Sequence, residues 1–304
     1  LVNYMNQILL ALVALANLIV AVTRALACAI RINEVFRVNS SMKEGAEEKN
    51  TQESGKPRVV FDHVTFTYGG AQEASLTDIS FSAMPGETVG IIGGTGSGKS
   101  TLVNLIPRFY DATKGSVTVD GQDVKAYTFR HLREKIGVVP QKAVLFLGTI
   151  RSNLQWRKKD AKERELWKAL QIAQAEEVVK KKQKGLDEKV ETGGRNFSGG
   201  QRQRLTIARA LIGEPEILIL DDSASALDFA TDAALRRSIK ESTGNATVFL
   251  VSQRAATVKN ADQILVLDDG KLVGKGTHEE LLKNCNVYKE ICMSQFSSQE
   301  VAQL

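Results

Sequence analysis

The pattern of apolar and polar positions divides the chain into a long apolar beginning and a mixed remainder. Residues 1–22 are predominantly apolar, and about 20 apolar residues suffice to cross a bilayer. From residue 58 onward, short apolar runs alternate with helical patterns, which favours an α/β domain with a mainly parallel sheet. We expect buried strands at 88–92, 136–139, 217–220, 247–251 and 263–267, and helices at 161–182, 201–212 and 231–241.

Two further segments predict a smaller β element. Residues 59–68 alternate like a half-buried strand, and residues 116–119, followed by Asp120 and Gly121, have the pattern of a hairpin arm. Residues 38–57, which precede them, are rich in Ser, Glu, Lys, Asn and Gly and lack apolar periodicity. That composition predicts a linker.

The flanks of the apolar segment indicate how it is used. No basic segment precedes it and no clear small-residue cleavage site follows, which argues against a signal peptide. Arg24, Arg31, Arg37 and Lys43 all follow the apolar run, which places its C-terminal end in the cytoplasm. Because the first residue is Leu1 rather than methionine, we expect the chain to be the C-terminal part of a longer polypeptide.

Polar residues share roughly one face of this predicted helix, because Asn3, Asn17, Arg24 and Arg31 fall on a seven-residue repeat. A polar stripe on a membrane helix usually points into a bundle or a water-filled path. The alternative is a helix that leaves the membrane near Arg24 and continues with one wet side. The two interpretations are compatible, and both stay open.

Composition narrows the class of protein. With 43% hydrophobic residues, the 304-residue chain can build a sizeable core. Its net charge of +5 comes from dispersed basic residues rather than clusters with aromatics, which argues against nucleic acid as a partner. Cys28, Cys285 and Cys292 have neither metal-ligand nor redox-pair spacing, so we expect reduced thiols.

A glycine-rich run follows the strand expected at 88–92 and precedes a helical pattern. In this context, glycines let backbone N–H groups wrap phosphates at a helix N-terminus. Lys99 can reach the β- and γ-phosphates, and Ser100 can ligate Mg²⁺. The predicted phosphate-binding residues are Gly93, Gly94, Thr95, Gly96, Ser97, Gly98, Lys99, Ser100 and Thr101.

The apolar strand at 217–220 ends in two carboxylates, Asp221 and Asp222. We expect Asp221 to hold the water shell of Mg²⁺ and Asp222 to polarise the attacking water. Aspartate is one carbon shorter than the glutamate usually given this task, about 1.5 Å, and a misplacement of about 1 Å can cost on the order of a hundredfold in rate. The chain is therefore expected to bind ATP but to hydrolyse it poorly at this site.

A second candidate anion site opens the helix expected at 201–212. Ser198, Gly199, Gly200 and Gln201 place a hydroxyl and glycine N–H groups at that helix N-terminus. This site is separate from the glycine-rich loop. Two γ-phosphate sites in one chain make sense if one of them serves a partner's nucleotide.

With these motifs in this order, the chain resembles the nucleotide-binding half of an ATP-binding-cassette exporter of the bacterial multidrug type, preceded by its last transmembrane helix. The resemblance covers essentially all residues. It implies a P-loop cassette with a mainly parallel sheet core, an antiparallel β subdomain and a helical signature subdomain. The implied division is 1–37 for the last transmembrane helix and its extension, 38–57 for the linker, 58–295 for the nucleotide-binding domain and 296–304 for the tail.

The resemblance also implies roles that the residues alone do not. Tyr68 matches the aromatic residue that stacks on adenine, and Gln141 matches the glutamine that touches Mg²⁺ and relays the nucleotide state to the membrane domain. Residues 225–228, ending in Asp228, resemble the loop that crosses the dimer interface. The implied cofactors are ATP and Mg²⁺, with the metal held by Ser100, Gln141 and Asp221.

Three positions depart from the family pattern. Gln253 stands where the family places a histidine, and glutamine can donate a hydrogen bond to a γ-phosphate but cannot carry the charge or proton of histidine. Asp222 replaces the catalytic glutamate. Phe197 replaces a leucine directly before Ser198, an apolar exchange that leaves the signature intact.

Weakened catalytic positions beside an intact signature resemble one half of a heterodimeric exporter. The site of Lys99 would be the degenerate one, and Ser198 would complete the competent site of a second exporter subunit. The catalytic residues implied for the chain's own site are Asp222, Gln253 and Gln141. The implied location is the cell membrane, multi-pass, with the nucleotide-binding domain in the cytoplasm and further transmembrane helices as partners.

Three alternatives stay open at this point. One is a homodimeric exporter that hydrolyses ATP slowly with Asp222. Another is a soluble cassette ATPase acting on ribosomes or DNA, against which the apolar segment 1–22 argues. The third is a regulatory nucleotide-binding protein without turnover, against which the intact signature at 198–200 argues. The transported substrate cannot be read here, because selectivity resides mostly in membrane helices.

Overall fold

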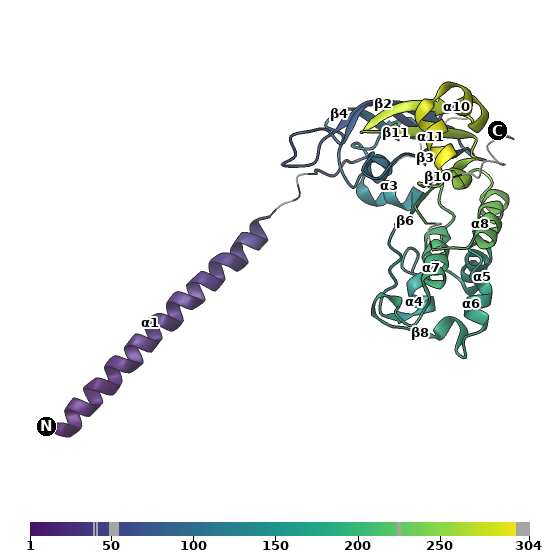
Figure 1. Ribbon diagram of the computed structural model, residues 1–304. Coiled ribbons are helices and arrows are strands. Elements are labelled where there is room, and N and C mark those ends of the chain that lie inside the picture. Colours follow the sequence, from purple (N-terminus) through teal and green to yellow (C-terminus); the bar gives the residue numbers. More distant parts are fainter. Residues whose placement is uncertain (39, 41, 49–54, 224–225, 296–304) are drawn as a thin grey trace. The chain divides into compact units, whose positions relative to one another are not determined.

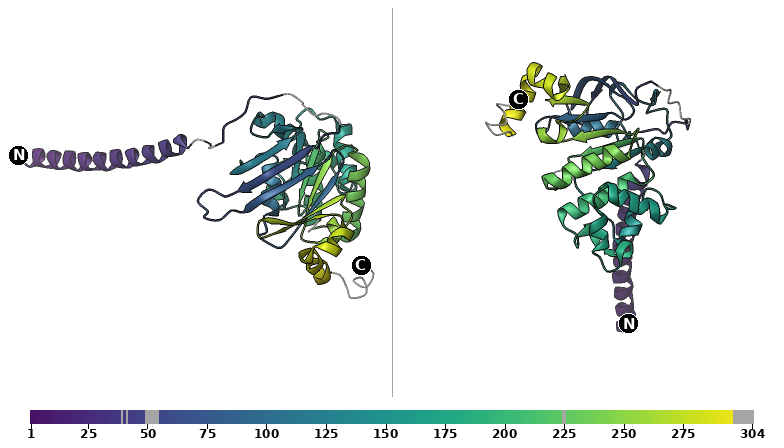
Figure 2. Two further views of the ribbon diagram at one scale, coloured as in Figure 1. Left: turned by 90° about the horizontal axis from the view of Figure 1, so that it is seen from above. Right: turned by 90° about the vertical axis from the view of Figure 1, so that its right-hand side faces the viewer.

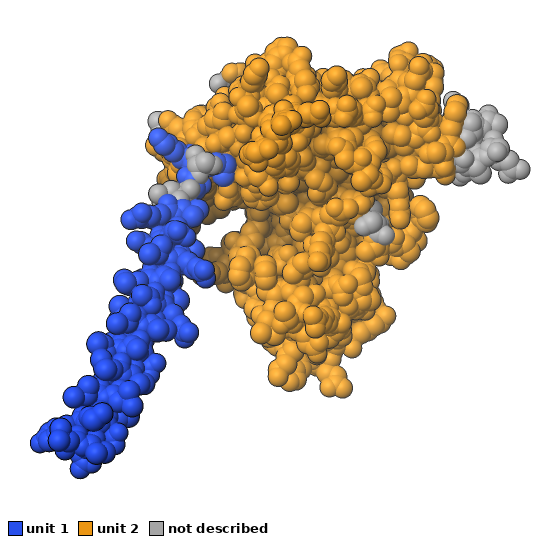
Figure 3. Space-filling view, turned by 60° about the vertical axis from the view of Figure 1, so that its left-hand side comes forward, with its two compact units in different colours: residues 1–43 blue, residues 44–304 orange. Residues whose placement is uncertain are grey.

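The structure, a computed structural model, describes residues 1–38, 40, 42–48, 55–223 and 226–295. The chain forms two compact units, Leu1–Lys43 and Glu44–Leu304, which Figure 3 shows in different colours. The expected C-terminal tail at 296–304, parts of the expected linker and Ser225 in the expected interface loop lie outside the described residues.

Unit 1 contains one long helix, α1 (Val2–Arg37), which ends in extended backbone at Val38. The helix has no glycine or proline in its interior, and Ala and Leu, both strong helix formers, recur along it. None of its residues is buried in the protein. By length and composition it is able to cross a membrane. The long apolar helix predicted from the sequence is confirmed.

Unit 2 is built around a six-stranded sheet with the strand order β12-β11-β3-β10-β9-β6 (Figure 1). All neighbouring strands are parallel except β12, which pairs antiparallel with β11. The five predicted core strands are confirmed. The sixth strand, β12, is not predicted from the sequence, because its residues are exposed or half-buried and form no apolar run. The strands are β3 (Thr88–Ile92), β6 (Ile136–Val139), β9 (Ile217–Asp221), β10 (Thr247–Val251), β11 (Gln263–Asp268) and β12 (Lys271–Gly276).

Successive residues of the central strands enter apolar clusters on opposite faces of this sheet. On β9, Leu218 and Leu220 belong to one cluster, and Ile217 and Ile219 belong to the other. Both faces are therefore covered, as is usual for parallel strands. Full burial of each such side chain contributes about 1.5–3 kcal/mol, so the strand ends that carry the site are firmly held.

A second, antiparallel sheet with the order β2-β1-β4-β5 shares one of these apolar clusters. Phe61 and Phe81 stack across its first two strands with ring centroids 4.6 Å apart. The predicted hairpin turn is confirmed, because Asp120 and Gly121 both have positive φ, 51° and 78°. The strands are β1 (Val59–Phe66), β2 (Leu76–Ala83), β4 (Lys114–Val119) and β5 (Gln122–Asp123).

Residues 44–48, within the segment predicted as a linker, are joined to unit 2 by backbone hydrogen bonds. The Gly45 N–H donates to the Tyr127 carbonyl at 3.1 Å, and the Glu47 N–H donates to the Ala126 carbonyl at 2.9 Å. A side chain at Gly45 would meet the Ala126 carbonyl oxygen at 2.1 Å, so this close approach requires glycine. This stretch is therefore part of unit 2.

A helical subdomain lies between β6 and β9 in the sequence. The single helix predicted over 161–182 is wrong, because the chain turns at Gln174, whose φ is 55°, while Ala173 and Ala175 are buried beside it. The subdomain contains β7 (Gly148–Thr149), α4 (Ile150–Leu154), α5 (Glu163–Ile172), α6 (Glu176–Lys180), a 3-10 turn (Gly185–Asp187), β8 (Lys189–Val190), a second 3-10 turn (Thr192–Gly194) and α7 (Gly199–Leu211).

The remaining helices surround the core sheet. The helices predicted at 201–212 and 231–241 are confirmed as α7 and α8, with slightly earlier starts. The C-terminal helices, yellow in Figure 2, pack beside β11 and β12. The helices outside the inserted subdomain are α2 (Lys99–Leu105), α3 (Phe129–Lys135), α8 (Phe229–Ser242), α9 (Ala255–Val258), α10 (His278–Asn284) and α11 (Asn286–Gln295).

Candidate functional site

The glycine-rich loop connects β3 to α2 at the carboxyl edge of the core sheet. Gly96 and Gly98 have φ values of 83° and 93°, a left-handed region that side chains rarely adopt. The Lys99 ammonium folds back along the loop and donates to the carbonyl oxygens of Gly93 at 2.9 Å and Gly94 at 2.5 Å. The loop thus holds its lysine among backbone groups.

The charge of Lys99 lies close to two carboxylates. The side chain is 9% exposed, and this burial lowers the pKa of Lys99, while Asp222 and then Asp221 raise that pKa. A buried ammonium beside two carboxylates is a strong point charge for an anion with several oxygens. Lys99 is the first residue of α2, Asp221 is the last residue of β9, and Asp222 follows it. The fold thus brings these three charged groups together.

Asp221 ends β9 and faces the first turn of α2. The Ser100 hydroxyl donates a hydrogen bond to Asp221 Oδ1 at 3.0 Å. Burial raises the pKa of the Asp221 carboxyl, the Ser100 hydrogen bond opposes this, and the Asp222 charge adds to it. A hydroxyl and a carboxylate in contact are hard oxygen donors of the kind that Mg²⁺ prefers.

Asp222 has an unusual backbone. Its φ is 43°, a conformation that aspartate tolerates better than most residues. Its N–H donates to the Val251 carbonyl at 2.9 Å, and its Oδ2 accepts from Gln141 Nε2 at 3.3 Å. The backbone bond joins Asp222 to the end of β10, and the side-chain bond joins it to the segment after β6.

A cavity of about 340 Å³ brings most of the predicted site residues together. Tyr68 lies on its wall, where the phenol shares a 3.0 Å hydrogen bond with the Thr101 hydroxyl. Gln253, two positions after the end of β10, reaches the same cavity. The lining residues are Tyr68, Ser75, Thr95, Gly96, Gly98, Lys99, Ser100, Thr101, Gln141, Asp221, Asp222, Val251 and Gln253.

Ser75 in this site, and Tyr110 beside its Tyr68, give no local signal in the sequence. Ser75 lines the cavity, and two positions further on the Thr77 N–H donates to the Gly270 carbonyl at 2.8 Å. Tyr110 meets Tyr68 edge-on with ring centroids 5.2 Å apart. Both are brought in by segments distant in the chain, so only the tertiary structure identifies them.

The predicted signature residues stand apart from this cavity. Ser198 caps α7, accepting from the Gln201 N–H at 3.3 Å while the Gln201 side chain accepts from the Ser198 N–H at 3.1 Å. Among the described residues that line the cavity, none comes from 198–201. The structure therefore separates the two predicted anion sites within one chain.

Asp228, the last residue of the predicted interface loop, caps α8. Its side chain accepts from the Thr231 N–H at 2.8 Å and from the Thr231 hydroxyl at 2.9 Å. These bonds lower the pKa of the Asp228 carboxyl, so it stays ionised at neutral pH. Asp228 is not among the described residues that line the cavity.

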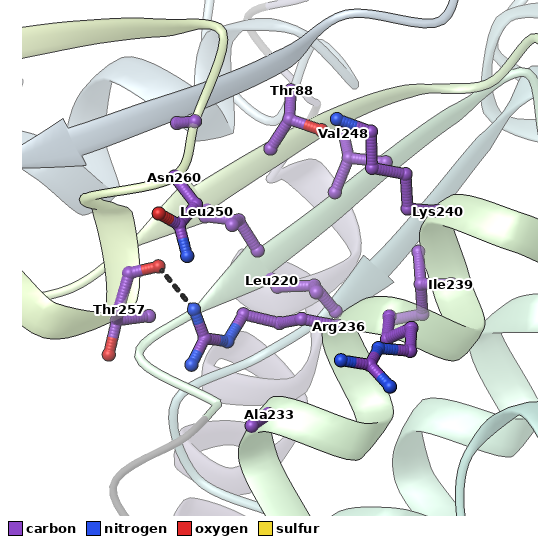
Figure 4. Close-up of a pocket in the computed structure, with 12 residues that line it drawn as sticks. Thr88, Leu220, Ala233, Arg236, Ile239, Lys240, Val248, Leu250, Thr257 and Asn260 are labelled. Carbon is purple, nitrogen blue, oxygen red and sulfur yellow. Dashed lines mark hydrogen bonds between the residues drawn. The ribbon is translucent and has the colours of Figure 1, made fainter. Parts of the chain in front are cut away.

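A second cavity, of about 350 Å³, lies between α8 and the strands β9 and β10 (Figure 4). Leu220, Val248 and Leu250 form an apolar wall, and Arg236 Nη1 donates across it to the Thr257 carbonyl at 3.1 Å. It contains no part of the glycine-rich loop and neither of the paired aspartates. The chemistry thus favours the first cavity as the functional site.

The first cavity fits a magnesium–nucleotide complex. At Gly94 and Gly96, an added side-chain carbon would meet no atom within 4 Å, so the loop backbone faces open space there. Lys99 would supply the charge for phosphates, and Ser100, Asp221 and Gln141 would supply oxygen donors for Mg²⁺. When bound, the metal would neutralise phosphate charge as the bond to the γ-phosphate breaks.

Comparison with known proteins agrees with this geometry. Residues 76–225 match the family model described as ABC transporter. A bacterial Atm1-family ABC exporter with ATP bound superposes with a TM-score of 0.79 at 34% sequence identity, covering 88% of this chain and 47% of that one. The chain therefore carries an ABC transporter ATP-binding domain of the P-loop fold, preceded in sequence by a long apolar helix.

The curated relatives narrow the resemblance further. An uncharacterized ABC transporter ATP-binding protein of Mycobacterium bovis is 44% identical over 98% of this chain and 52% of its own length. The ATP-dependent lipid A-core flippase of Haemophilus ducreyi is 41% identical over 79% and 41%, and a probable multidrug resistance ABC transporter ATP-binding/permease protein of Bacillus subtilis is 39% identical over 94% and 49%. The chain thus spans about half the length of these relatives.

Proposed function

We propose that this chain is the ATP-binding part of an ATP-driven membrane exporter whose own site binds MgATP and hydrolyses it slowly. The observation that carries the proposal is the cavity in which Lys99, Ser100, Asp221 and Asp222 converge. The apolar helix α1 and the exporter named in the structural match favour a membrane protein over a soluble cassette ATPase. In this proposal, α1 is one of several spanning helices.

The residues divide the work at this site between binding and chemistry. Lys99 and the loop N–H groups hold the phosphates, and Ser100 with Asp221 holds Mg²⁺. Asp222 is the only carboxylate besides Asp221 among the described residues lining the cavity, so it is the candidate for orienting the attacking water. Its side chain is about 1.5 Å shorter than that of a glutamate, which is expected to slow hydrolysis about a hundredfold.

Gln253 weakens the same step through a different contact. It lines the cavity together with Lys99 and Asp222, where its amide can donate a hydrogen bond to the γ-phosphate. A neutral amide cannot become cationic as charge accumulates on the transferred group. We propose that both departures leave ATP binding intact and reduce turnover.

The signature at Ser198 is proposed to act in trans. It lies outside the chain's own cavity, yet its capping arrangement at the N-terminus of the 13-residue helix α7 is complete and suited to an anion. We propose that it closes the catalytic site of a second subunit, whose own glutamate and histidine perform hydrolysis. The names of the relatives suggest an amphipathic substrate, a lipid or a drug.

The binding half of this proposal is tested by measuring the ATP dissociation constant of the intact protein. Lys99→Ala removes the buried ammonium and is expected to weaken ATP binding about tenfold or more, because hydrogen bonds to charged groups contribute about 1.5–3 kcal/mol. Lys275→Ala, at an exposed position on β12, is the matched control and leaves the affinity unchanged. Equal affinity of both variants would contradict the assignment of the site.

A further inference from the structure

The last described residue of the chain, Gln295, contacts the segment that carries Gln253. Its Oε1 accepts a hydrogen bond from the Ala255 N–H at 2.8 Å, and its Nε2 donates to the Gln253 carbonyl at 2.7 Å. The two partners lie 40 and 42 positions away in the sequence. One carboxamide at the end of α11 thus bridges two backbone groups that flank Arg254.

This contact satisfies a backbone group that the segment cannot satisfy locally. The first N–H groups of a helix have no partner within the helix. Arg254 is the N-cap of α9, and its side chain makes no capping bond. Gln295 Oε1 supplies the missing acceptor for the first N–H of α9. Gln295 is therefore a cap delivered from another helix.

The contact also completes the backbone restraint on Gln253. On the upstream side, the Ser252 N–H donates to the Ile91 carbonyl at 3.0 Å, which ties the segment to β3. On the downstream side, Gln295 holds the Gln253 carbonyl. The Gln253 side chain, which reaches the cavity beside Lys99, thus projects from backbone that is held on both sides.

Packing of α11 determines where Gln295 lies. Tyr288 and Cys292 on this helix are buried, with 0% and 1% exposure, and the Tyr288 hydroxyl shares a 2.8 Å hydrogen bond with His278 Nδ1 of α10. Gln295 follows Cys292 by three positions, which places it on the same face of the helix. The C-terminal helices and the γ-phosphate side of the cavity are therefore connected through one side chain.

We infer that Gln295 is a positioning residue for Gln253, and that docking of α11 controls how well the site distinguishes ATP from ADP. This inference rests on the proposed contact between Gln253 and the γ-phosphate. ADP lacks that phosphate, so loss of the restraint weakens ATP binding selectively. A residue that merely stabilised the fold would affect both nucleotides equally.

The test compares dissociation constants for MgATP and MgADP on the intact protein, measured by displacement of a fluorescent ATP analogue. Gln295→Ala is expected to weaken ATP binding about fivefold to tenfold, the effect of losing the one hydrogen bond from Gln253 to the γ-phosphate, and to leave ADP binding within about twofold. Gln295→Glu keeps the acceptor for Ala255 but sets a carboxylate oxygen against the Gln253 carbonyl, which repels it, so this variant weakens ATP binding at least as much as Gln295→Ala. Met293→Ala, at an exposed position of the same helix, is the matched control.

The double variant Gln253→Ala with Gln295→Ala tests whether Gln295 acts through Gln253. If Gln295 acts through Gln253, the double variant discriminates no worse than Gln253→Ala alone. A loss of discrimination in Gln253→Ala but not in Gln295→Ala would overturn the inference and leave the proposed function standing. Unchanged discrimination in both single variants would overturn the γ-phosphate role of Gln253 and the inference with it.

Discussion

At the scale of single residues, the proposed chemistry of the site depends on Asp222. Its backbone is fixed by the hydrogen bond to Val251 and by a positive φ of 43°, so the position of its carboxylate follows from the length of one short side chain. Gln141 already donates to it at 3.3 Å. A longer acid at this position would extend into the cavity without moving the strand.

Returning both positions, Asp222 and Gln253, to the residues of the family pattern tests this explanation. Asp222→Glu returns the missing reach to the attacking water, and Gln253→His returns a side chain that can carry charge. We expect measurable hydrolysis at the Lys99 site only in the double variant, because groups that act on one transition state are strongly non-additive. The measurement is ATP turnover of the assembled exporter whose partner lacks its own catalytic glutamate. No turnover above the single variants would place the defect in the partner's signature instead.

A second prediction at this scale concerns pH and stability. Burial and the neighbouring Asp222 charge raise the pKa of Asp221 in the folded protein, against the opposing effects of Ser100 and Lys99. Ionised Asp221 therefore costs stability above its folded-state pKa, and this cost disappears as the pH falls toward the ordinary aspartate value of about 3.9. The variant Asp221→Asn keeps an acceptor for Ser100 and removes the charge.

We expect ligand-free Asp221→Asn to unfold a few degrees above the wild type near neutral pH, with a difference that shrinks on acidification. The same variant should lose the Mg²⁺-dependent part of its stabilisation by ATP, because the carboxylate ligand is gone. Thermal unfolding across a pH series, with and without MgATP, measures both effects. A pH-independent difference would refute the electrostatic explanation.

At the scale of elements, the core strands are predictable because their signals are continuous. β9 and β10 are short apolar runs that are buried on both faces. β2 gives no comparable pattern, since positive φ at Asp78 and shifts of register interrupt its alternation. The turn at Gln174 is set by burial of its neighbours in the folded protein, which no local pattern reports.

The residues of the candidate site also fall into two groups, those that the sequence predicts and those that only the fold reveals. The glycine-rich loop and the paired aspartates are contiguous in sequence, so their chemistry could be predicted residue by residue. Ser75 and Gln295 act through contacts with distant segments, and neither stands in a recognisable motif. Local sequence therefore predicts candidate phosphate and metal contacts, whereas the residues proposed to complete or orient the site are found only from the fold.

Among the elements, α7 is proposed to act on the partner's nucleotide through Ser198 at its N-terminus. Ser198→Arg fills the space at its N-terminus with a long side chain and removes a cap that contributes about 1 kcal/mol. We expect the ATPase rate of the assembled exporter to fall about a hundredfold, as when an anion-stabilising group is removed from an active site. The affinity of the isolated chain for ATP should stay unchanged, because Ser198 lies outside its own cavity.

The matched control for this experiment is Ser242→Arg, which places the same side chain at the exposed end of α8. It should leave both the ATPase rate and the affinity as in the wild type. Weaker ATP binding by the isolated Ser198→Arg chain would show that the signature serves the chain's own nucleotide.

At the scale of the whole molecule, α1 is expected to anchor the chain in a membrane. Its residues are unburied in the protein itself, so lipid or other spanning helices are the natural surroundings for its apolar surface. Leu12→Arg with Val13→Arg should sharply reduce membrane integration, because each arginine near the centre of a span costs about 2.5–3.5 kcal/mol. Alkaline extraction of membranes measures the integrated fraction.

The matched control places the same two arginines near the other end of α1, as Val35→Arg with Phe36→Arg. These positions follow Arg24 and Arg31 and lie beyond the predominantly apolar stretch, so integration should be retained. Extraction of the first double variant at the wild-type level would contradict a spanning role for residues 1–22.

The central claim, that the Lys99 site retains ATP rather than hydrolysing it, is tested most directly by labelling the bound nucleotide. The chain is purified with its partner subunit, allowed to turn over, and photolabelled in parallel with 8-azido-ATP carrying ³²P in the α- or the γ-phosphate. Retained ATP leaves both labels on the peptide that contains Tyr68, and this is the result we predict. The α-label without the γ-label on that peptide would show that ATP had been hydrolysed beside Lys99, and would contradict the account.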